Sequence, residues 1–248
     1  RSVAIGSSAL NPQNAGSAGQ NMYNTAVGYA AGASTTTGTK NTLIGGDVGV
    51  SLTIGNFNTA LGYGALNASV DGDYNTAIGY QALLSYEDGD GNGHNTAIGN
   101  QSQLNASTGE FNTSLGSSSM GSGVTTGDFN SAIGYRALED FVADTDGHGN
   151  NTAVGANAML NVSTGTGNTA LGTSAIGSGV TTGNSNNAIG HQAGSSLTSG
   201  TCNNIMGTNA GDALTTGYFN VAIGHNALTT SVSGRNSTAI GFQALLNE

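Results

Sequence analysis

The chain has 248 residues, of which 42 are glycine and only one, Pro12, is proline. Charged residues make up 7% of it and the formal net charge is −10, with four scattered basic residues. Because nucleic acids and anionic membranes are bound through clustered lysines and arginines, this composition argues against both kinds of partner. The apolar runs are far shorter than a membrane span, so no membrane insertion is expected. A single cysteine, Cys202, leaves no pair for an internal disulfide.

A phrase of the form Asn-Thr-Ala-Ile-Gly opens fourteen successive units. The units start at Ser2, Asn24, Asn41, Asn58, Asn75, Asn95, Asn112, Asn130, Asn151, Asn168, Asn186, Asn203, Asn220 and Ser237. Eight of the thirteen spacings are 17 residues and the others exceed 17 by 1 to 5. So short a period is typical of a solenoid, whose units bury a core only by stacking. We therefore predict one solenoid domain over residues 1–248, and expect the sequence, which begins and ends in mid-repeat, to be a piece of a longer chain.

Within each unit, the second to fourth positions have the composition of a short strand, as in 76–78, with Thr and Ile on one face and Ala on the other. The eighth and ninth positions, as in 82–83, form a second candidate strand. Glycines at the fifth and fifteenth positions are the expected corners, because glycine adopts positive φ at little cost. These features predict an all-β fold, a parallel β-solenoid or β-roll of about 14 coils with a 17-residue period.

Alanine at the third and eighth positions predicts a thin interior, which buries little apolar area per residue. Such a coil needs additional burial from outside the chain. Asparagine opens twelve of the fourteen units. Stacked asparagine side chains hydrogen-bond along the axis of cross-β structures, so we assign these residues a structural ladder.

Two columns of aromatic residues recur at fixed positions of the unit. The last position holds residues that we interpret as packing or subunit contacts: Tyr23, Phe57, Tyr74, Phe111, Phe129 and Phe219. The sixth position is expected near the surface, where exposed aromatics could contact a sugar or a partner. Together with two aromatics of the longer loops, this column gives the candidate receptor-binding residues Tyr29, Tyr63, Tyr80, Tyr86, Tyr135 and Phe141.

The irregular spacings reveal a larger repeat of three units, 75–129 and 130–185, each with an acidic insertion in its first unit. The segment Asp88-Gly-Asp-Gly-Asn-Gly93 matches the first half of an EF-hand loop, in which alternate oxygen ligands surround calcium. Neither insertion completes that motif, and a solvated loop is the alternative. The candidate calcium ligands are Asp88, Asp90, Asn92, Asp144 and Asp146. No other cofactor is expected.

The phrase Asn75-Thr-Ala-Ile-Gly-Tyr-Gln-Ala-Leu resembles the short repeats in the head domains of trimeric autotransporter adhesins. It is also similar to repeats of bacteriophage tail fibres and bacterial surface fibres, which often precede a self-cleaving endosialidase-type chaperone. The resemblance covers essentially the whole chain, although the usual head repeat is a few residues shorter. It implies a left-handed β-roll, a side-by-side homotrimer and an extracellular location on a cell surface or virion. Trimerisation would also supply the extra burial that the thin coil needs.

These observations favour a structural and adhesive fibre module that attaches to a cell-surface glycan or protein receptor and is not an enzyme. One alternative is a polysaccharide-degrading phage fibre domain, which would need a carboxylate pair in a groove. The other is an ice-binding solenoid, which would need flat rows of threonine. The Thr-Thr pair before the second glycine is missing from many units, so the sequence disfavours that alternative.

Overall fold

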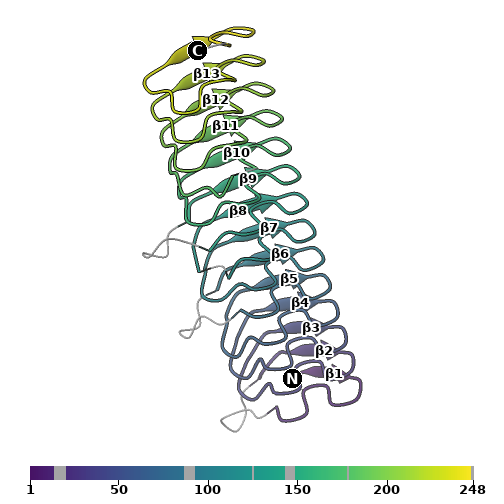
Figure 1. Ribbon diagram of the computed structural model, residues 1–248. Helices are drawn as coiled ribbons and strands as arrows, with labels where there is room; N and C mark the ends of the chain where they lie inside the picture. The colour runs from purple at the N-terminus through teal and green to yellow at the C-terminus, as the bar shows by residue number, and fades with distance from the viewer. Residues whose placement is uncertain (14–20, 87–92, 125, 143–148, 178, 247–248) are drawn as a thin grey trace. The chain divides into compact units, whose positions relative to one another are not determined.

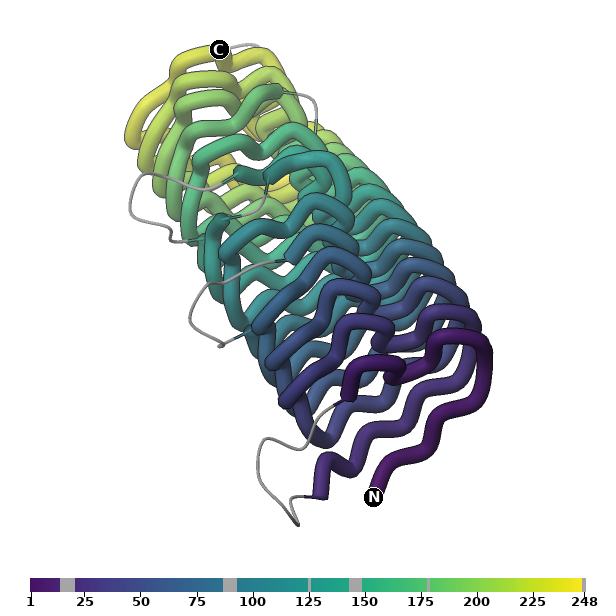
Figure 2. Tube along the Cα trace, turned by 90° about the horizontal axis from the view of Figure 1, so that it is seen from below, coloured from purple at the N-terminus to yellow at the C-terminus, as the bar shows by residue number. Residues whose placement is uncertain are grey.

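The computed structural model describes residues 1–13, 21–86, 93–124, 126–142, 149–177 and 179–246. Among these residues there is no helix, and the chain forms a parallel β-solenoid with a period of about 17 residues. The coils fall into two compact units, Arg1–Thr126 and Gly127–Glu248. Figure 2 shows that, within each unit, every turn of the chain follows the path of the turn before it.

Each of these two compact units contains seven three-residue strands. Parallel pairings join the strands into six turns in each compact unit (Figure 1). The strands of the first unit are β1 (Val3–Ile5), β2 (Thr25–Val27), β3 (Thr42–Ile44), β4 (Thr59–Leu61), β5 (Thr76–Ile78), β6 (Thr96–Ile98) and β7 (Thr113–Leu115). Those of the second are β8 (Ser131–Ile133), β9 (Thr152–Val154), β10 (Thr169–Leu171), β11 (Asn187–Ile189), β12 (Asn204–Met206), β13 (Val221–Ile223) and β14 (Thr238–Ile240). All coincide with the strands predicted at the second to fourth positions.

The middle residue of almost every strand points into the coil. Ala26, Ala60 and Ala77 are completely buried, whereas the residues on either side of them are half-buried or exposed. The eighth position adds a second row of buried alanines, and the leucines or methionines at the ninth position fill the remaining space. The predicted thin, alanine-lined interior is therefore confirmed.

The second predicted strand, around the eighth and ninth positions, is wrong. The seventh and ninth positions adopt left-handed backbone conformations, as at Gln81 (φ 52°) and Leu83 (φ 51°), which no β-strand contains. Their N–H groups still bond to the neighbouring coils: Gln81 donates to the carbonyl of Tyr63 at 2.9 Å and Leu83 to that of Ser102 at 2.9 Å. The backbone is satisfied here by turns in register rather than by a sheet.

The two glycine positions serve different purposes. Gly45, at the fifth position, has a φ of +139°, and a Cβ there would meet the Gly62 carbonyl oxygen. At the fifteenth position Gly55 has no positive φ, but a Cβ would lie only 2.5 Å from the Gly72 carbonyl oxygen. The fifth glycine is thus a corner, as predicted. The fifteenth is required because successive coils approach each other too closely for a side chain.

Buried asparagines connect each coil to the next. Asn58 donates its backbone N–H to Asn41 Oδ1 at 2.9 Å and accepts the N–H of Asn75 on its own Oδ1 at 2.8 Å. Its Nδ2 donates to the carbonyl of Gly72 at 2.7 Å. The same pattern recurs in the second unit, where Asn203 bonds to Asn186, Asn220 and Gly217. We call these residues the asparagine ladder; the structure confirms it.

We predict that Asn58→Ala lowers the free energy of unfolding by about 1–3 kcal/mol, because it leaves the Asn75 N–H and the Gly72 carbonyl without the hydrogen bonds that the Asn58 side chain makes. The measurement is chemical denaturation followed by circular dichroism. Asn100→Ala is the matched control, since Asn100 is exposed and its side chain makes no hydrogen bond within the described residues. Equal losses for the two variants would contradict the prediction.

Candidate functional site

At the last position of the repeat, four aromatic side chains stack on one another: Phe57, Tyr74, His94 and Phe111, here called the aromatic ladder. Successive ring centroids are 4.8, 4.7 and 4.9 Å apart, with interplanar angles of 8° or less. All four residues have φ between 53° and 59°, which turns each side chain outward at the same corner. The Lys40 ammonium lies 4.3 Å from the Phe57 ring centroid.

The predicted packing role of Phe57, Tyr74 and Phe111 is visible as this stacking along the chain. Both faces of the Tyr74 and His94 rings are covered by their stacked neighbours, so these rings present mainly their edges to solvent. A sugar needs a free ring face to stack on. Tyr23, Phe129 and Phe219, from the same column, are also exposed. Sequence analysis missed His94 and Lys40 as members of this column. Each directly precedes the asparagine that opens the next repeat, and so occupies the last position of its own repeat.

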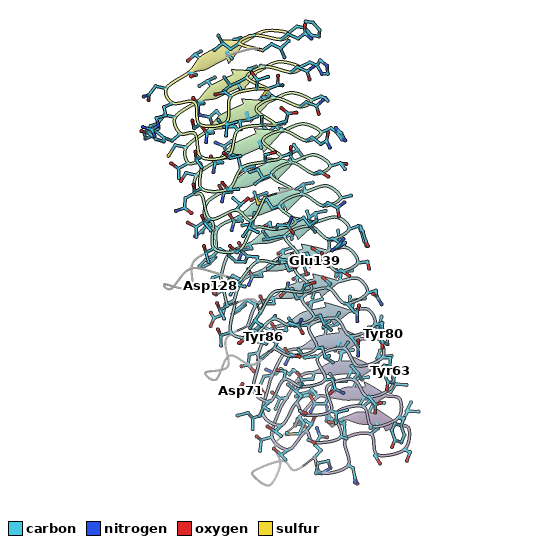
Figure 3. The ribbon with its side chains drawn as sticks, viewed as in Figure 1. Tyr63, Asp71, Tyr80, Tyr86, Asp128 and Glu139 are labelled. Carbon is cyan, nitrogen blue, oxygen red and sulfur yellow. The ribbon has the colours of Figure 1, made fainter. Side chains whose placement is uncertain are left out.

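The sixth-position column is exposed, as expected. Tyr29 is 65% and Tyr63 55% exposed, and Tyr80 and Tyr135 are similarly accessible. Tyr63 and Tyr80, labelled in Figure 3, stack with their centroids 5.9 Å apart. The Asp47 carboxylate accepts a hydrogen bond from the Tyr63 hydroxyl and thereby raises the pKa of Tyr63 above its usual value. These four candidates are available to a partner.

Tyr86 and Phe141 were predicted to be receptor contacts, but the structure corrects both: each is completely buried. They occupy the twelfth position, which faces the interior, and small residues on adjacent coils make room for their rings. For Tyr86 these neighbours are Ser69 and Ala106, and a Cβ on Gly72 would lie 3.0 Å from Tyr86 Cδ1. Tyr86, labelled in Figure 3, is the last described residue before residues 87–92. Both rings anchor the start of an insertion instead of presenting a surface.

The predicted calcium ligands Asp88, Asp90, Asn92, Asp144 and Asp146 lie outside the described residues, and calcium binding stays a prediction. Near the second insertion, Arg136 pairs with the largely buried Glu139, which raises the pKa of Arg136. Among the described residues no three His, Cys, Asp or Glu side chains are grouped so as to hold a metal ion.

The outer face of the strands is the side opposite the predicted alanine interior, and sequence analysis did not name it as a surface for a partner. We call it the strand face: the second and fourth positions, which point away from the alanine core. The fourth position carries exposed aliphatic side chains in both units: Ile5, Ile44, Leu61 and Leu115 in the first, and Ile133, Leu171, Met206, Ile223 and Ile240 in the second. No charged residue occurs at any of the fourteen strands. The face is therefore apolar, with threonine hydroxyls along one side.

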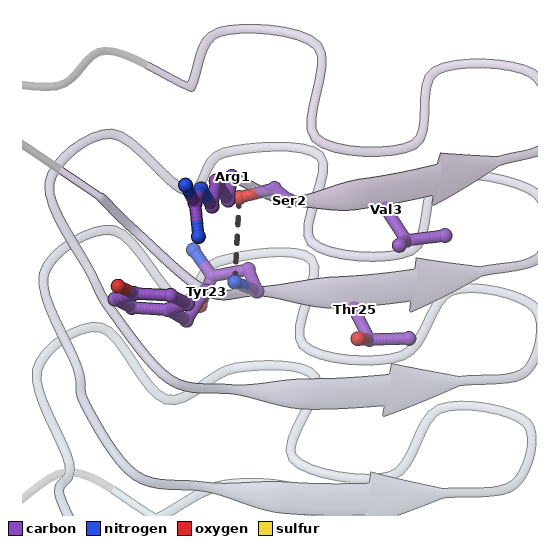
Figure 4. Close-up of a pocket in the computed structure, with 6 residues that line it drawn as sticks. Arg1, Ser2, Val3, Tyr23 and Thr25 are labelled. Atoms are coloured by element: carbon purple, nitrogen blue, oxygen red, sulfur yellow. Dashed lines mark hydrogen bonds between the residues drawn. The ribbon is translucent and has the colours of Figure 1, made fainter.

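Two shallow hollows along the strands are lined by described residues. One of about 300 Å³ is lined by Arg1, Ser2, Val3, Tyr23, Asn24 and Thr25; there Asn24 donates its N–H to Ser2 Oγ at 3.3 Å (Figure 4). The other, of about 210 Å³, lies on the strand face of β11–β13, between Asn187, Asn204 and Met206. Neither contains a carboxylate or a histidine, so neither offers an acid–base pair for catalysis.

No protein-family model matches the chain, and no curated protein matches it either. Among the described residues no helix could cross a membrane. Because their side chains are exposed, the strand face and the sixth-position column are the candidate functional surfaces.

We predict that Phe141→Ala destabilises the protein by about 3–5 kcal/mol, the usual cost of deleting a fully buried phenylalanine side chain. Tyr135→Ala, in the same coil, removes an exposed ring and is expected to change stability far less. Thermal melting of both variants checks this. Similar melting temperatures would mean that Phe141 is not part of the core.

Asp212 gives a pH-dependent prediction. Burial raises the pKa of its carboxyl group, and Oδ1 has no hydrogen-bond partner among the described residues. A raised folded-state pKa means that the charged form destabilises the fold, so stability falls as the pH rises through that pKa. We expect Asp212→Asn to melt at a higher temperature than the wild type at neutral pH. The difference should vanish below about pH 3, where the carboxyl group is protonated; a difference independent of pH would contradict this assignment.

Proposed function

We propose that the chain is a structural and adhesive module of a trimeric extracellular fibre, in which three copies pack side by side through the strand face. The observation that carries the proposal is the apolar, uncharged character of that face in both units. Large contiguous apolar surfaces on soluble proteins mark interaction sites, and the cores of protein interfaces are depleted in charge. The resemblance to trimeric adhesin heads supplies the expected number of copies.

The thin coil supports assembly on energetic grounds. Its interior holds mostly alanine, whereas the larger aliphatic side chains stand outside on the strand face. Fully burying one such side chain contributes about 1.5–3 kcal/mol relative to leaving it exposed. Packing copies together would bury a whole row of these side chains and give each chain the core that it cannot build alone.

The attachment role is proposed for surfaces that such a trimer leaves accessible. The sixth-position tyrosines project from a corner of the coil and not from the strand face. A cell-surface glycan or protein would be contacted there without catalysis, and the fibre would act by holding many identical contacts in a row.

One observation favours a competing function for the same face. In β2–β7 the second position is threonine in every strand, which forms a regular row on a parallel sheet. Such rows are the feature required for ice binding, and this row differs from the interrupted Thr-Thr pairs considered from the sequence. The neighbouring row is aliphatic and not a second threonine row, which favours packing against another chain.

Light scattering coupled to gel filtration tests the proposal, with the mass of three chains expected for the wild type. Leu61→Asp combined with Leu115→Asp places charges on the strand face and should shift the mass towards one chain. The control combines Ile54→Asp and Val70→Asp, which are similarly exposed but lie elsewhere on the coil, and should remain trimeric. A well-folded wild-type monomer would contradict the proposal. A monomer that also shows thermal hysteresis would support ice binding in its place.

A further inference from the structure

The strand face is nearly uniform along each unit, so most of its contacts would not fix how neighbouring copies align. Most strands present threonine at one end and an aliphatic residue at the other, and neighbouring strands are about 4.8 Å apart. Two copies packed side by side could slide by one coil and make almost the same contacts. A copy shifted relative to its neighbour generates an open helical array instead of a closed trimer. A closed trimer therefore needs a feature that fixes the axial register.

The strand face departs from this uniformity at β11 and β12. Asn187 and Asn204 occupy the second position there, and they are the only amide side chains in the fourteen described strands. Each directly follows a buried residue of the asparagine ladder but is itself exposed. The two residues are partners in the sheet, and Asn187 Nδ2 donates to Asn204 Oδ1 at 3.0 Å. We call these two residues the amide pair.

The amide pair lies in apolar surroundings. It lines the hollow of about 210 Å³ on the strand face together with Ile189, Met206 and Ile223. Asn187 Oδ1 and Asn204 Nδ2 make no other hydrogen bond with the described residues, so one acceptor and one donor remain available. Covering either group with aliphatic side chains would leave it unsatisfied, whereas another amide can both donate to it and accept from it.

The amide pair distinguishes two ways of packing three copies around an axis. If the second-position row of one copy lay against the fourth-position row of the next, side chains such as Ile189 and Met206 would cover the amides and leave them without partners. If the second-position rows meet instead, symmetry brings the amide pairs of all copies to the same height. The free acceptor of one copy can then receive the free donor of another, which satisfies both groups.

We propose that the second-position rows of the assembled copies meet at the axis, and that the amide pair fixes their register by hydrogen-bonding to the amide pairs of the other copies. The partner that covers the hollow is thus a second copy of this chain. The inference rests on the fibre proposed above and adds which row lies innermost. A buried asparagine specifies register in the same way in coiled coils. A slip of one coil would place Asn204 of one copy against Val221 of another, which offers no hydrogen bond.

The test is a mixing experiment between the wild type and a chain whose amide pair has been moved. The moved-pair chain carries Asn187→Thr and Asn204→Thr together with Thr59→Asn and Thr76→Asn, which keeps the composition and places the pair seven repeats earlier, in β4 and β5. Wild-type chain labelled with heavy nitrogen is unfolded with the moved-pair chain, refolded and analysed by native mass spectrometry. Mixed trimers should be depleted about tenfold relative to random mixing, because they bury amides without partners.

A second variant, Asn187→Val with Asn204→Val, removes the amide pair without creating another. Its ladder residues Asn186 and Asn203 are untouched, so each coil keeps its bonds to the next. This variant should form its own trimers but mix poorly with the wild type, since valine offers the wild-type amides no hydrogen bond.

The matched control is an amide pair outside the strand face, where Gln101 Nε2 donates to Gln81 Oε1 at 3.1 Å. Both residues occupy the seventh position of the repeat, at a corner of the coil. Gln81→Ser with Gln101→Ser should mix with the wild type at the random proportion. Serine already occupies this position at Ser118 and Ser174, with the same left-handed backbone conformation, so the control variant should fold normally.

Random mixing of the wild type with either strand-face variant would overturn the proposal. Equal depletion in the glutamine control would overturn it as well, because any surface change would then impair mixing. Melting curves of the separate chains show whether each variant folds. A monomeric wild type overturns both this inference and the fibre proposal, whereas a wild-type trimer that mixes at random overturns only the role of the amide pair.

Discussion

The arrangement of every surface on this protein depends on the asparagine ladder. A ladder residue such as Asn58 makes two side-chain hydrogen bonds, because its Oδ1 accepts the next asparagine N–H while its Nδ2 donates to a glycine carbonyl. Since a strand follows directly after each asparagine, this bonding aligns the three strand residues of all coils within a unit. A shift of one residue would turn the alanines outward and the aliphatic side chains inward. The ladder therefore decides which side chains form the core and which form the strand face.

The small core has a direct effect on the exterior. Because alanine fills most of the interior, large side chains are found chiefly in regular rows on the outside: aliphatic on the strand face and aromatic at two corners. In most globular domains such residues would be buried. Here their repetition at the coil spacing creates long, uniform surfaces, which suit a partner with a matching repeat better than a compact small molecule.

Much of the fold could be predicted from the sequence, because the ladder, the core row and the corner each depend on one residue type at one position of the repeat. Asn at the first position, Ala at the third and Gly at the fifth predicted the ladder, the core row and the corner. The second strand was mispredicted since left-handed conformations at residues such as Gln81 and Leu83 have no reliable sequence signal when the residue is not glycine. Tyr86 and Phe141 were misplaced because burial depends on neighbours one coil away, such as Ser69 and Ala106.

The acidic insertions leave the Oδ1 hydrogen bonds of the asparagine ladder intact. Asn95 bonds to Asn75 Oδ1 at 3.1 Å across 20 residues, and Asn151 bonds to Asn130 Oδ1 at 3.0 Å across 21, as neighbours do elsewhere across 17. Extra residues at this point of the coil therefore leave the register unchanged, although they alter the Nδ2 bond: Asn75 Nδ2 has no partner among the described residues, and Asn130 Nδ2 donates to the carbonyls of Gly127 and Asp128. In this scaffold the asparagine at the start of each repeat must stay constant, whereas the number of residues between two such asparagines can vary. Residues 87–92 and 143–148 are therefore positions at which foreign sequence can be exchanged, since the asparagine bonds that flank them form across 20 or 21 residues as they do elsewhere across 17.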